Sequence, residues 1–174
     1  MANWIWRNKK ENRDEGFSLV ELLIVVIIMG ILAAIAIPLF LSQRAKAEDA
    51  KTEADVETLA KEMATWFTDD SVSALPYIAV TNHVSPYNEQ AFRLGSDDAA
   101  SKDTTGTANI IGKAANNLKE GKFSGTGKAD WCVSLTNNNG RVQTYGATPL
   151  KGVQAGLTCS GTTRDIALTA PVTP

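Results

Sequence analysis

Gly16, Phe17 and Glu21 are the residues of this sequence whose types and spacing most directly suggest chemistry. A peptide bond cut between Gly16 and Phe17 would give Phe17 a new α-amine, four residues ahead of the Glu21 carboxylate. In a low-dielectric bundle of helices, pairing an amine with a carboxylate is strongly favoured over leaving either charge alone. The spacing therefore predicts a cleavage followed by charge pairing, within one chain or between copies. The alternative is a lone carboxylate that snorkels to a membrane interface.

The residues that follow Glu21 form an uncharged run long enough to cross a membrane. Residues 22–41 contain no Asp, Glu, Lys or Arg, and twenty helical residues cover about 30 Å, the thickness of a bilayer's hydrocarbon core. The polar leader, residues 1–16, carries four basic and three acidic residues. The positive-inside rule therefore predicts the leader in the cytoplasm and residues from 42 onward outside. A standard secretory signal would have its apolar run before the cut, not after it.

Residues 16–38, GFSLVELLIVVIIMGILAAIAIP, resemble the N-terminus of type IV pilins and their relatives. The resemblance is close over residues 16–38 and continues in character over residues 39–67. It implies that a membrane prepilin peptidase cuts between Gly16 and Phe17, that Phe17 is N-methylated, and that Glu21 pairs with the N-terminus of a neighbouring subunit.

Gly30 and Pro38 lie inside the apolar run, and both residue types weaken a helix. The resemblance implies that residues 30–38 are helical in the membrane and partly extended once subunits pack into a fibre. An ordinary kink in a membrane helix is the alternative.

Residues 42–67 are predicted to continue the helix as an amphipathic segment, because they contain no Gly or Pro. Five apolar residues recur at i, i+3, i+4, i+7 and i+11, which is one helical face; they are Val56, Leu59, Ala60, Met63 and Phe67. The face opposite is charged, and is either solvated or paired with basic residues of neighbouring subunits; it carries Glu53, Asp55, Glu57, Lys61 and Glu62. The helix is predicted to stop near residues 68–71.

Residues 71–174 are predicted to form a small β-sheet head. Asn137–Gly140 is a turn signal between two alternating stretches, which indicates a β-hairpin. The predicted strands are residues 76–81, 91–94, 129–136, 141–145 and 153–159, and the predicted loops are 95–106 and 116–127. Trp131 and Tyr145 are predicted to be core residues or same-face hairpin partners.

Cys132 and Cys159 are the two cysteines of the chain. Outside the cytoplasm disulfides persist, so one bridge is the simplest prediction, with two separate buried thiols as the alternative. The resemblance points the same way, because pilins often close a C-terminal loop with one disulfide. A metal site is disfavoured, since there is no Cys-x-x-Cys and His83 is the only histidine. A loose calcium site at Asp97, Asp98 and Asp103 misses the EF-hand pattern.

No catalytic residue, cofactor or metal is predicted, because the sequence lacks a Cys/His pair at useful spacing and a Gly-rich phosphate loop. A head with nine basic and seven acidic residues gives no support to DNA as a partner.

The predicted fold class is α+β of the type IV pilin kind. A long N-terminal helix packs on a small antiparallel β-sheet head. The predicted segments are a cleaved leader (1–16), a transmembrane and assembly helix (17–41), an amphipathic continuation (42–70) and the head (71–174).

The predicted function is that of a structural pilus subunit. It resides in the cytoplasmic membrane as a single-pass precursor and at the cell surface once assembled. The predicted partners are other copies of the chain, the prepilin peptidase and the pilus assembly machinery of the cytoplasmic membrane. The alternative is a pseudopilin of a type II secretion-like or competence (DNA-uptake) machine, which shares the whole N-terminal motif. The head's length and its predicted disulfide favour a pilin.

Overall fold

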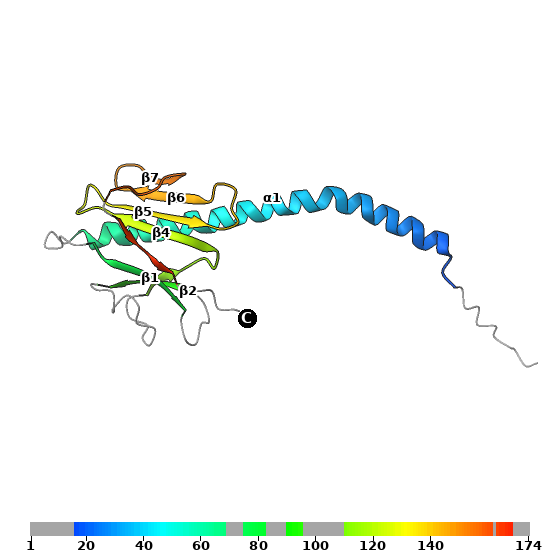
Figure 1. Cartoon of the computed structure of the whole chain (residues 1–174), viewed down its shortest axis with the longest axis horizontal. Helices are drawn as coiled ribbons and strands as arrows, with labels where there is room; N and C mark the ends of the chain where they lie inside the picture. The colour runs from blue at the N-terminus through cyan, green and yellow to red at the C-terminus, as the bar shows by residue number, and fades with distance from the viewer. Residues whose placement is uncertain (1–15, 69–74, 83–89, 96–109, 162, 169–174) are drawn as a thin grey trace, which may run out of the picture. The chain divides into compact units, whose positions relative to one another are not determined.

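The computed structural model describes residues 16–68, 75–82, 90–95, 110–161 and 163–168, within which one helix is followed by nine strands (Figure 1). The chain divides into two compact units, Met1–Phe40 and Leu41–Pro174. The elements are α1 (Leu19–Trp66), β1 (Tyr77–Asn82), β2 (Gln90–Gly95), β3 (Ile110–Lys113), β4 (Leu118–Ser124), β5 (Cys132–Asn137), β6 (Thr144–Thr148), β7 (Gly152–Ala155), β8 (Thr163–Asp165) and β9 (Ala167–Leu168). The predicted α+β fold class is confirmed.

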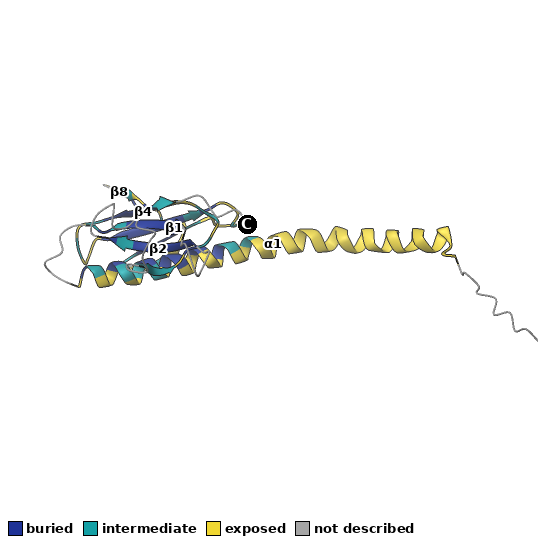
Figure 2. Cartoon of the chain, turned by 90° about the horizontal axis from the view of Figure 1, so that it is seen from below, coloured by how far each residue is buried: buried dark blue, intermediate teal, exposed yellow. Residues whose placement is uncertain are grey.

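The first unit contains the apolar part of α1. Among the described residues, α1 is the one helix long and apolar enough to cross a membrane, with a mean hydropathy of 3.1 over its best window and none of that window buried. Figure 2 shows this stretch as exposed along its whole length. Pro38 lies inside the helix, as does Gly30. Residues 30–38 are thus helical here, and their extended state in a fibre stays a prediction.

The second unit combines the rest of α1 with two sheets. The four-stranded sheet has the order β3-β2-β1-β9, and the five-stranded sheet has the order β7-β6-β5-β4-β8. All neighbouring strands are antiparallel except β1 and β9, which are parallel. Ile166 alone separates β8 from β9, and its N–H donates to the Gly121 carbonyl at 2.8 Å. One short segment therefore supplies an edge strand to each sheet.

The predicted apolar stripe of α1 forms the core of the second unit with both sheets. Val56, Leu59, Met63 and Phe67 are buried, and Ala60 packs against them. The strands contribute Ile78, Val80, Phe92, Phe123, Val133, Leu135, Tyr145 and Ala147 to the same cluster, and Trp131, Ala114 and Ile166 join it from between strands. Burial of apolar area on this scale is the main stabilising term of a small domain.

The prediction of a loop at residues 116–127 is wrong over most of its length, because residues 118–124 form β4, the strand between β5 and β8. The misleading residue is Gly121. A Cβ at Gly121 would meet Leu135 and Ile166 side-chain atoms at 2.8–2.9 Å. Glycine is thus needed there for close packing, which is one of the meanings a glycine can have inside a strand.

The predicted hairpin is present as β5 and β6, in the register Leu135↔Tyr145 and Thr136↔Thr144. Its second strand begins at Thr144, three residues later than predicted. The backbone N–H groups of residues 141–143 bind the Asp49 carboxylate of α1, so they do not extend the ladder toward β5. The strands predicted at residues 76–81 and 91–94 are confirmed as β1 and β2, and β7 covers the start of the stretch predicted at 153–159.

A disulfide joins Cys132, the first residue of β5, to Cys159, with a Cα–Cα distance of 5.7 Å. The bridge ties the segment that follows β7 to the start of β5. Both cysteines are buried.

Replacing both cysteines by serine is expected to lower the free energy of unfolding by about 3 kcal/mol, because the bridge restricts a loop with a sequence separation of 27 residues in the unfolded chain. Urea unfolding of the full-length protein in detergent measures the difference. A reductant should leave the serine variant unchanged, and equal stability of the variant and the oxidised wild type would contradict the prediction.

Some predictions fall on residues outside those that the structure describes. They are His83, the calcium candidates Asp97, Asp98 and Asp103, and the loop predicted at 95–106 beyond Gly95.

Candidate assembly site

The residues around the predicted cut precede and begin α1. The Leu22 N–H donates to the Ser18 carbonyl at 3.2 Å, which makes Ser18 the N-cap residue and puts Glu21 in the first turn. A carboxylate in the first turn interacts favourably with the positive end of the helix dipole. Gly16 and Phe17 precede the helix without regular secondary structure, and both are exposed. The predicted scissile bond is therefore accessible.

Among the residues that the structure describes, no hydrogen bond or ion pair is recorded for the Glu21 carboxylate. Phe17 is 81% exposed. All but two of the exposed large hydrophobic residues in the described ranges lie between Phe17 and Leu41; the two others are Val142 and Leu150. An exposed apolar surface of this extent marks contact with a membrane or with other protein chains.

A second feature, which the sequence analysis did not predict, joins α1 to the β5–β6 loop. Asp49 of α1 accepts hydrogen bonds from the backbone N–H groups of Arg141, Val142 and Gln143, at 2.8, 2.9 and 3.1 Å. Successive backbone N–H groups that converge on one anion form a nest. Gln143, at the end of the nest, has a positive φ of 68°. We call these contacts, together with those of Asn137 described next, the Asp49 latch.

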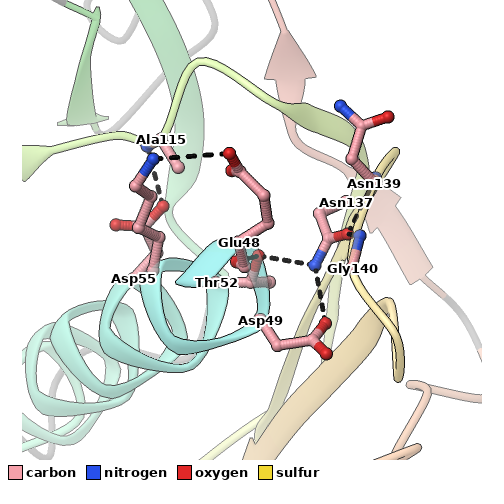
Figure 3. Close-up of polar contacts among 9 residues, drawn as sticks. Glu48, Asp49, Thr52, Asp55, Ala115, Asn137, Asn139 and Gly140 are labelled. Carbon is pink, nitrogen blue, oxygen red and sulfur yellow. Dashed lines mark hydrogen bonds and ion pairs between the residues drawn. The ribbon is translucent and has the colours of Figure 1, made fainter. Parts of the chain in front are cut away.

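Asn137 completes the latch from the end of β5 (Figure 3). Its buried amide N–H₂ donates to Asp49 Oδ1 at 3.3 Å and to Thr52 Oγ1 at 2.9 Å. Its Oδ1 accepts from the N–H groups of Asn139, at 3.2 Å, and Gly140, at 2.6 Å. A Cβ at Gly140 would overlap the Asp49 carboxylate and come within 2.6–2.7 Å of the Asn137 amide, so only glycine fits there.

The latch keeps the Asp49 carboxylate ionised. Burial alone would raise its pKa, but the hydrogen bonds from the Val142, Gln143 and Arg141 backbone and from the Asn137 side chain outweigh burial, so the pKa lies below its ordinary value. Asp49 and Thr52 lie seven and four residues before Val56, and are buried like the apolar stripe. The spacing of three and four residues continues the apolar stripe toward the N-terminus, and it is the signal by which the sequence could have predicted that Asp49 and Thr52 are buried.

Asp55 is not on the solvated face where it was predicted. It is 9% exposed, and its Oδ2 accepts the Ala115 N–H at 2.8 Å (Figure 3). Burial raises the pKa of Asp55 to about 6, against smaller lowering effects of the Ala115 N–H and of Lys51. Glu53, Glu57 and Lys61 are exposed as predicted, with Lys61 paired to Glu57 at 2.9 Å.

The raised pKa of Asp55 predicts that the stability of the protein depends on pH between about pH 4 and pH 7. Because its folded pKa is raised above 3.8, the contribution of Asp55 to the free energy of unfolding is fully present below pH 3.8 and is lost as the pH rises through about 6. The free energy of unfolding should fall by about 3 kcal/mol over this range. An Asp55→Asn variant should lack this loss and exceed the wild type in stability at pH 7.

Urea unfolding of the full-length chain in detergent at several pH values between 4 and 7 tests this expectation. Glu53→Gln is the matched control, since Glu53 is an exposed carboxylate on the same helix. Parallel pH profiles of the wild type and Asp55→Asn would refute it.

The structure keeps Gly16, Phe17 and Glu21 together at the start of α1, and it joins Cys132 to Cys159. In the described ranges, no group of three or more His, Cys, Asp or Glu side chains could hold a metal ion. The site thus combines an accessible backbone bond, a carboxylate without a recorded partner among the described residues, and an exposed apolar helix.

Comparison with known proteins identifies the N-terminal segment. The family model described as the prokaryotic N-terminal methylation motif matches residues 12–37. This range contains the predicted cut, Glu21, Gly30 and most of the uncharged run.

Curated relatives match part of the chain. The type IV major pilin protein PilA of Myxococcus xanthus (strain DK1622) is 40% identical over 57 residues, 33% of this chain and 26% of that protein. The type II secretion system core protein G of Vibrio cholerae is 36% identical over 64 residues, 37% of this chain and 44% of that protein. The fimbrial protein EcpB of Eikenella corrodens is 56% identical over 36 residues, 21% of this chain and 23% of that protein.

The chain thus spans less than half the length of these curated relatives. No solved structure matches it significantly. The methylation motif, residues 12–37, includes the start of α1. The chain thus carries an N-terminal methylation motif, and over part of its length it is similar to a type IV major pilin and to a core protein of a type II secretion system.

Proposed function

We propose that this chain is the structural subunit of a type IV pilus. It is made as a membrane precursor, cut between Gly16 and Phe17 by a prepilin peptidase, and N-methylated at Phe17. The subunits then polymerise through residues 17–41, and residues 71–174 face the outside of the fibre. The observation that carries the proposal is the Glu21 carboxylate, which has no recorded partner among the described residues and lies in the first turn of an exposed apolar helix with a methylation motif.

Two energy terms favour assembly. Packing of apolar helices replaces their contact with lipid through van der Waals contacts. Pairing Glu21 with the Phe17 amine of a neighbouring subunit removes two charges that would each be costly alone in a low-dielectric bundle. Gly30 and Pro38 weaken the helix between them and let that segment extend in the fibre. The chain performs no catalysis in this scheme; the peptidase and the assembly machinery of the cytoplasmic membrane act on it.

A second candidate is a pseudopilin of a type II secretion-like or competence machine. The similarity to a type II secretion core protein favours it directly, at an identity close to that of the similarity to a major pilin. Both candidates use the same N-terminal chemistry, and they differ in whether long fibres reach the cell surface.

Mass spectrometry of sheared surface fibres tests the proposal. A pilus subunit should be abundant in the fibres, with Phe17 as its methylated N-terminus. A processed chain that stays in the cell envelope would favour the pseudopilin. A chain that keeps residues 1–16 in the fibre, or that is never cut, would overturn the proposal.

A further inference from the structure

A pocket lies where the second unit begins. Leu41, Arg44 and Ala45 of α1 line it together with Asn139 of the β5–β6 loop, and its volume is about 230 Å³. Asn139 is far from the helix in sequence. It reaches the pocket because the Asp49 latch binds the loop to α1 through Arg141, Val142 and Gln143.

Two arginines lie in the pocket lining or next to it in sequence. Arg44 and Arg141 are exposed, and no ion pair is recorded for them with the described residues. The two acidic residues of the same stretch are already engaged. Glu48 pairs with Lys51 at 3.5 Å, and Asp49 is bound by the loop N–H groups. Arg44 lines the pocket, and Arg141 follows the lining residue Asn139 by two positions, so positive charge accompanies a pocket that offers the Arg44 guanidinium and the Asn139 amide as donors.

Leu41 fixes the depth of the pocket in a membrane. It is the last residue of the uncharged run, it is exposed, and it lines the pocket. Side chains that directly follow a membrane-spanning run lie at the level of the lipid headgroups. Arginine binds phosphate through charge-assisted hydrogen bonds, and basic residues beside a membrane helix attract anionic lipids.

We propose that this pocket binds the phosphate of an anionic phospholipid in the bilayer that holds the precursor. Arg44 and Asn139 donate hydrogen bonds to the phosphate, and Arg141 adds attraction. The inference rests on the membrane precursor of the proposed function and adds a specific lipid contact to it. A neighbouring copy of the chain is the competing occupant, since Glu53 and Glu57 are exposed carboxylates.

Full-length protein in lipid nanodiscs made from equal parts phosphatidylglycerol and phosphatidylcholine tests the inference. Native mass spectrometry of the released protein counts the lipids that stay bound. The wild type should retain phosphatidylglycerol preferentially. Arg44→Gln should reduce that preference about fivefold, because each basic residue near an anionic surface contributes about that factor. The double variant Arg44→Gln/Arg141→Gln should reduce it further.

Three further variants make the result specific. Arg44→Lys keeps the charge and should retain most of the preference. Lys151→Gln and Lys61→Gln each remove one exposed lysine outside the pocket lining and should change nothing. Far-ultraviolet circular dichroism of each variant checks that it is folded.

Equal retention of the two lipids by the wild type would overturn the inference, as would equal losses in Arg44→Gln and Lys151→Gln. A photo-crosslinker at position 44 that labels a second copy of the chain and no lipid would also overturn it, in favour of a contact between subunits. A chain that stays out of the nanodiscs would overturn it together with the membrane precursor. A chain that inserts but shows no lipid preference would overturn the proposed lipid contact and leave the membrane precursor intact.

Discussion

A chain in which Glu21 is replaced by alanine is expected to enter the membrane normally and to form few or no fibres. Insertion depends on the uncharged run, residues 22–41, which the substitution leaves intact. Assembly depends on pairing the Glu21 carboxylate with the new Phe17 amine of a neighbour. Without the carboxylate that amine would be buried unpaired, and removing one partner of a buried ion pair costs about 3–5 kcal/mol.

The loss recurs at every subunit that joins the fibre, so a large effect on fibre yield is expected. Yield is measured as the amount of chain in sheared fibres relative to the amount in membranes. Glu21→Gln should behave like Glu21→Ala, because the amide keeps the shape but not the charge. Glu53→Gln is the matched control, since Glu53 is an exposed carboxylate of α1 outside the apolar run.

The N-terminus of the Glu21→Ala chain must be determined as well. If Phe17 is its N-terminus, the peptidase still acts and the defect lies in assembly. Abundant fibres of normal appearance from the Glu21→Ala chain would contradict the role proposed for Glu21.

The features that the sequence predicted well are those that repeat regularly or depend on a local signal. The apolar stripe from Val56 to Phe67 repeats at helical spacing, and it is buried as a unit. The Asn137–Gly140 signal marks a real connection between two antiparallel strands. The short strands predicted at residues 76–81 and 91–94 correspond to β1 and β2. Each of these signals is contained within a single element or turn.

The features that the sequence did not predict depend on contacts between distant segments. Gly121 appeared to break a strand, yet it is needed because Leu135 and Ile166 pack where its side chain would be. Asp55 appeared solvated, yet the Ala115 N–H makes its burial possible. The late start of β6 follows from hydrogen bonds between the loop and Asp49, a residue more than ninety positions earlier. Residue type alone indicates polarity, whereas burial depends on which partner the fold supplies.

The Asp49 latch is expected to be the most sensitive polar site of the second unit. Asp49→Ala removes the acceptor of three backbone N–H groups and of the Asn137 amide. A buried donor left without an acceptor costs about 1–3 kcal/mol, and these losses are not additive. We therefore expect the free energy of unfolding to fall by about 3 kcal/mol or more, whereas Glu53→Ala on the exposed face of the helix should change it little.

The pH dependence of the latch has the opposite sign to that of Asp55. Because the folded pKa of Asp49 is lowered, its contribution is present above pH 3.8 and is lost as the pH falls through the folded value. The difference in stability between the wild type and Asp49→Ala should therefore be constant from pH 5 to 7 and shrink in strong acid. A difference that grows in acid would contradict this assignment.

Gly140→Ala tests the same latch from its other side. The new Cβ would collide with the Asp49 carboxylate and the Asn137 amide, so the loop must move away from α1 although Asp49 is still present. If both substitutions act by breaking one latch, the double variant Asp49→Ala/Gly140→Ala should lose clearly less stability than the two single losses added together. Simple additivity would mean that Gly140 stabilises the loop independently of Asp49. In that case the carboxylate would be a local helix-to-loop contact and not what holds residues 137–143 against the helix.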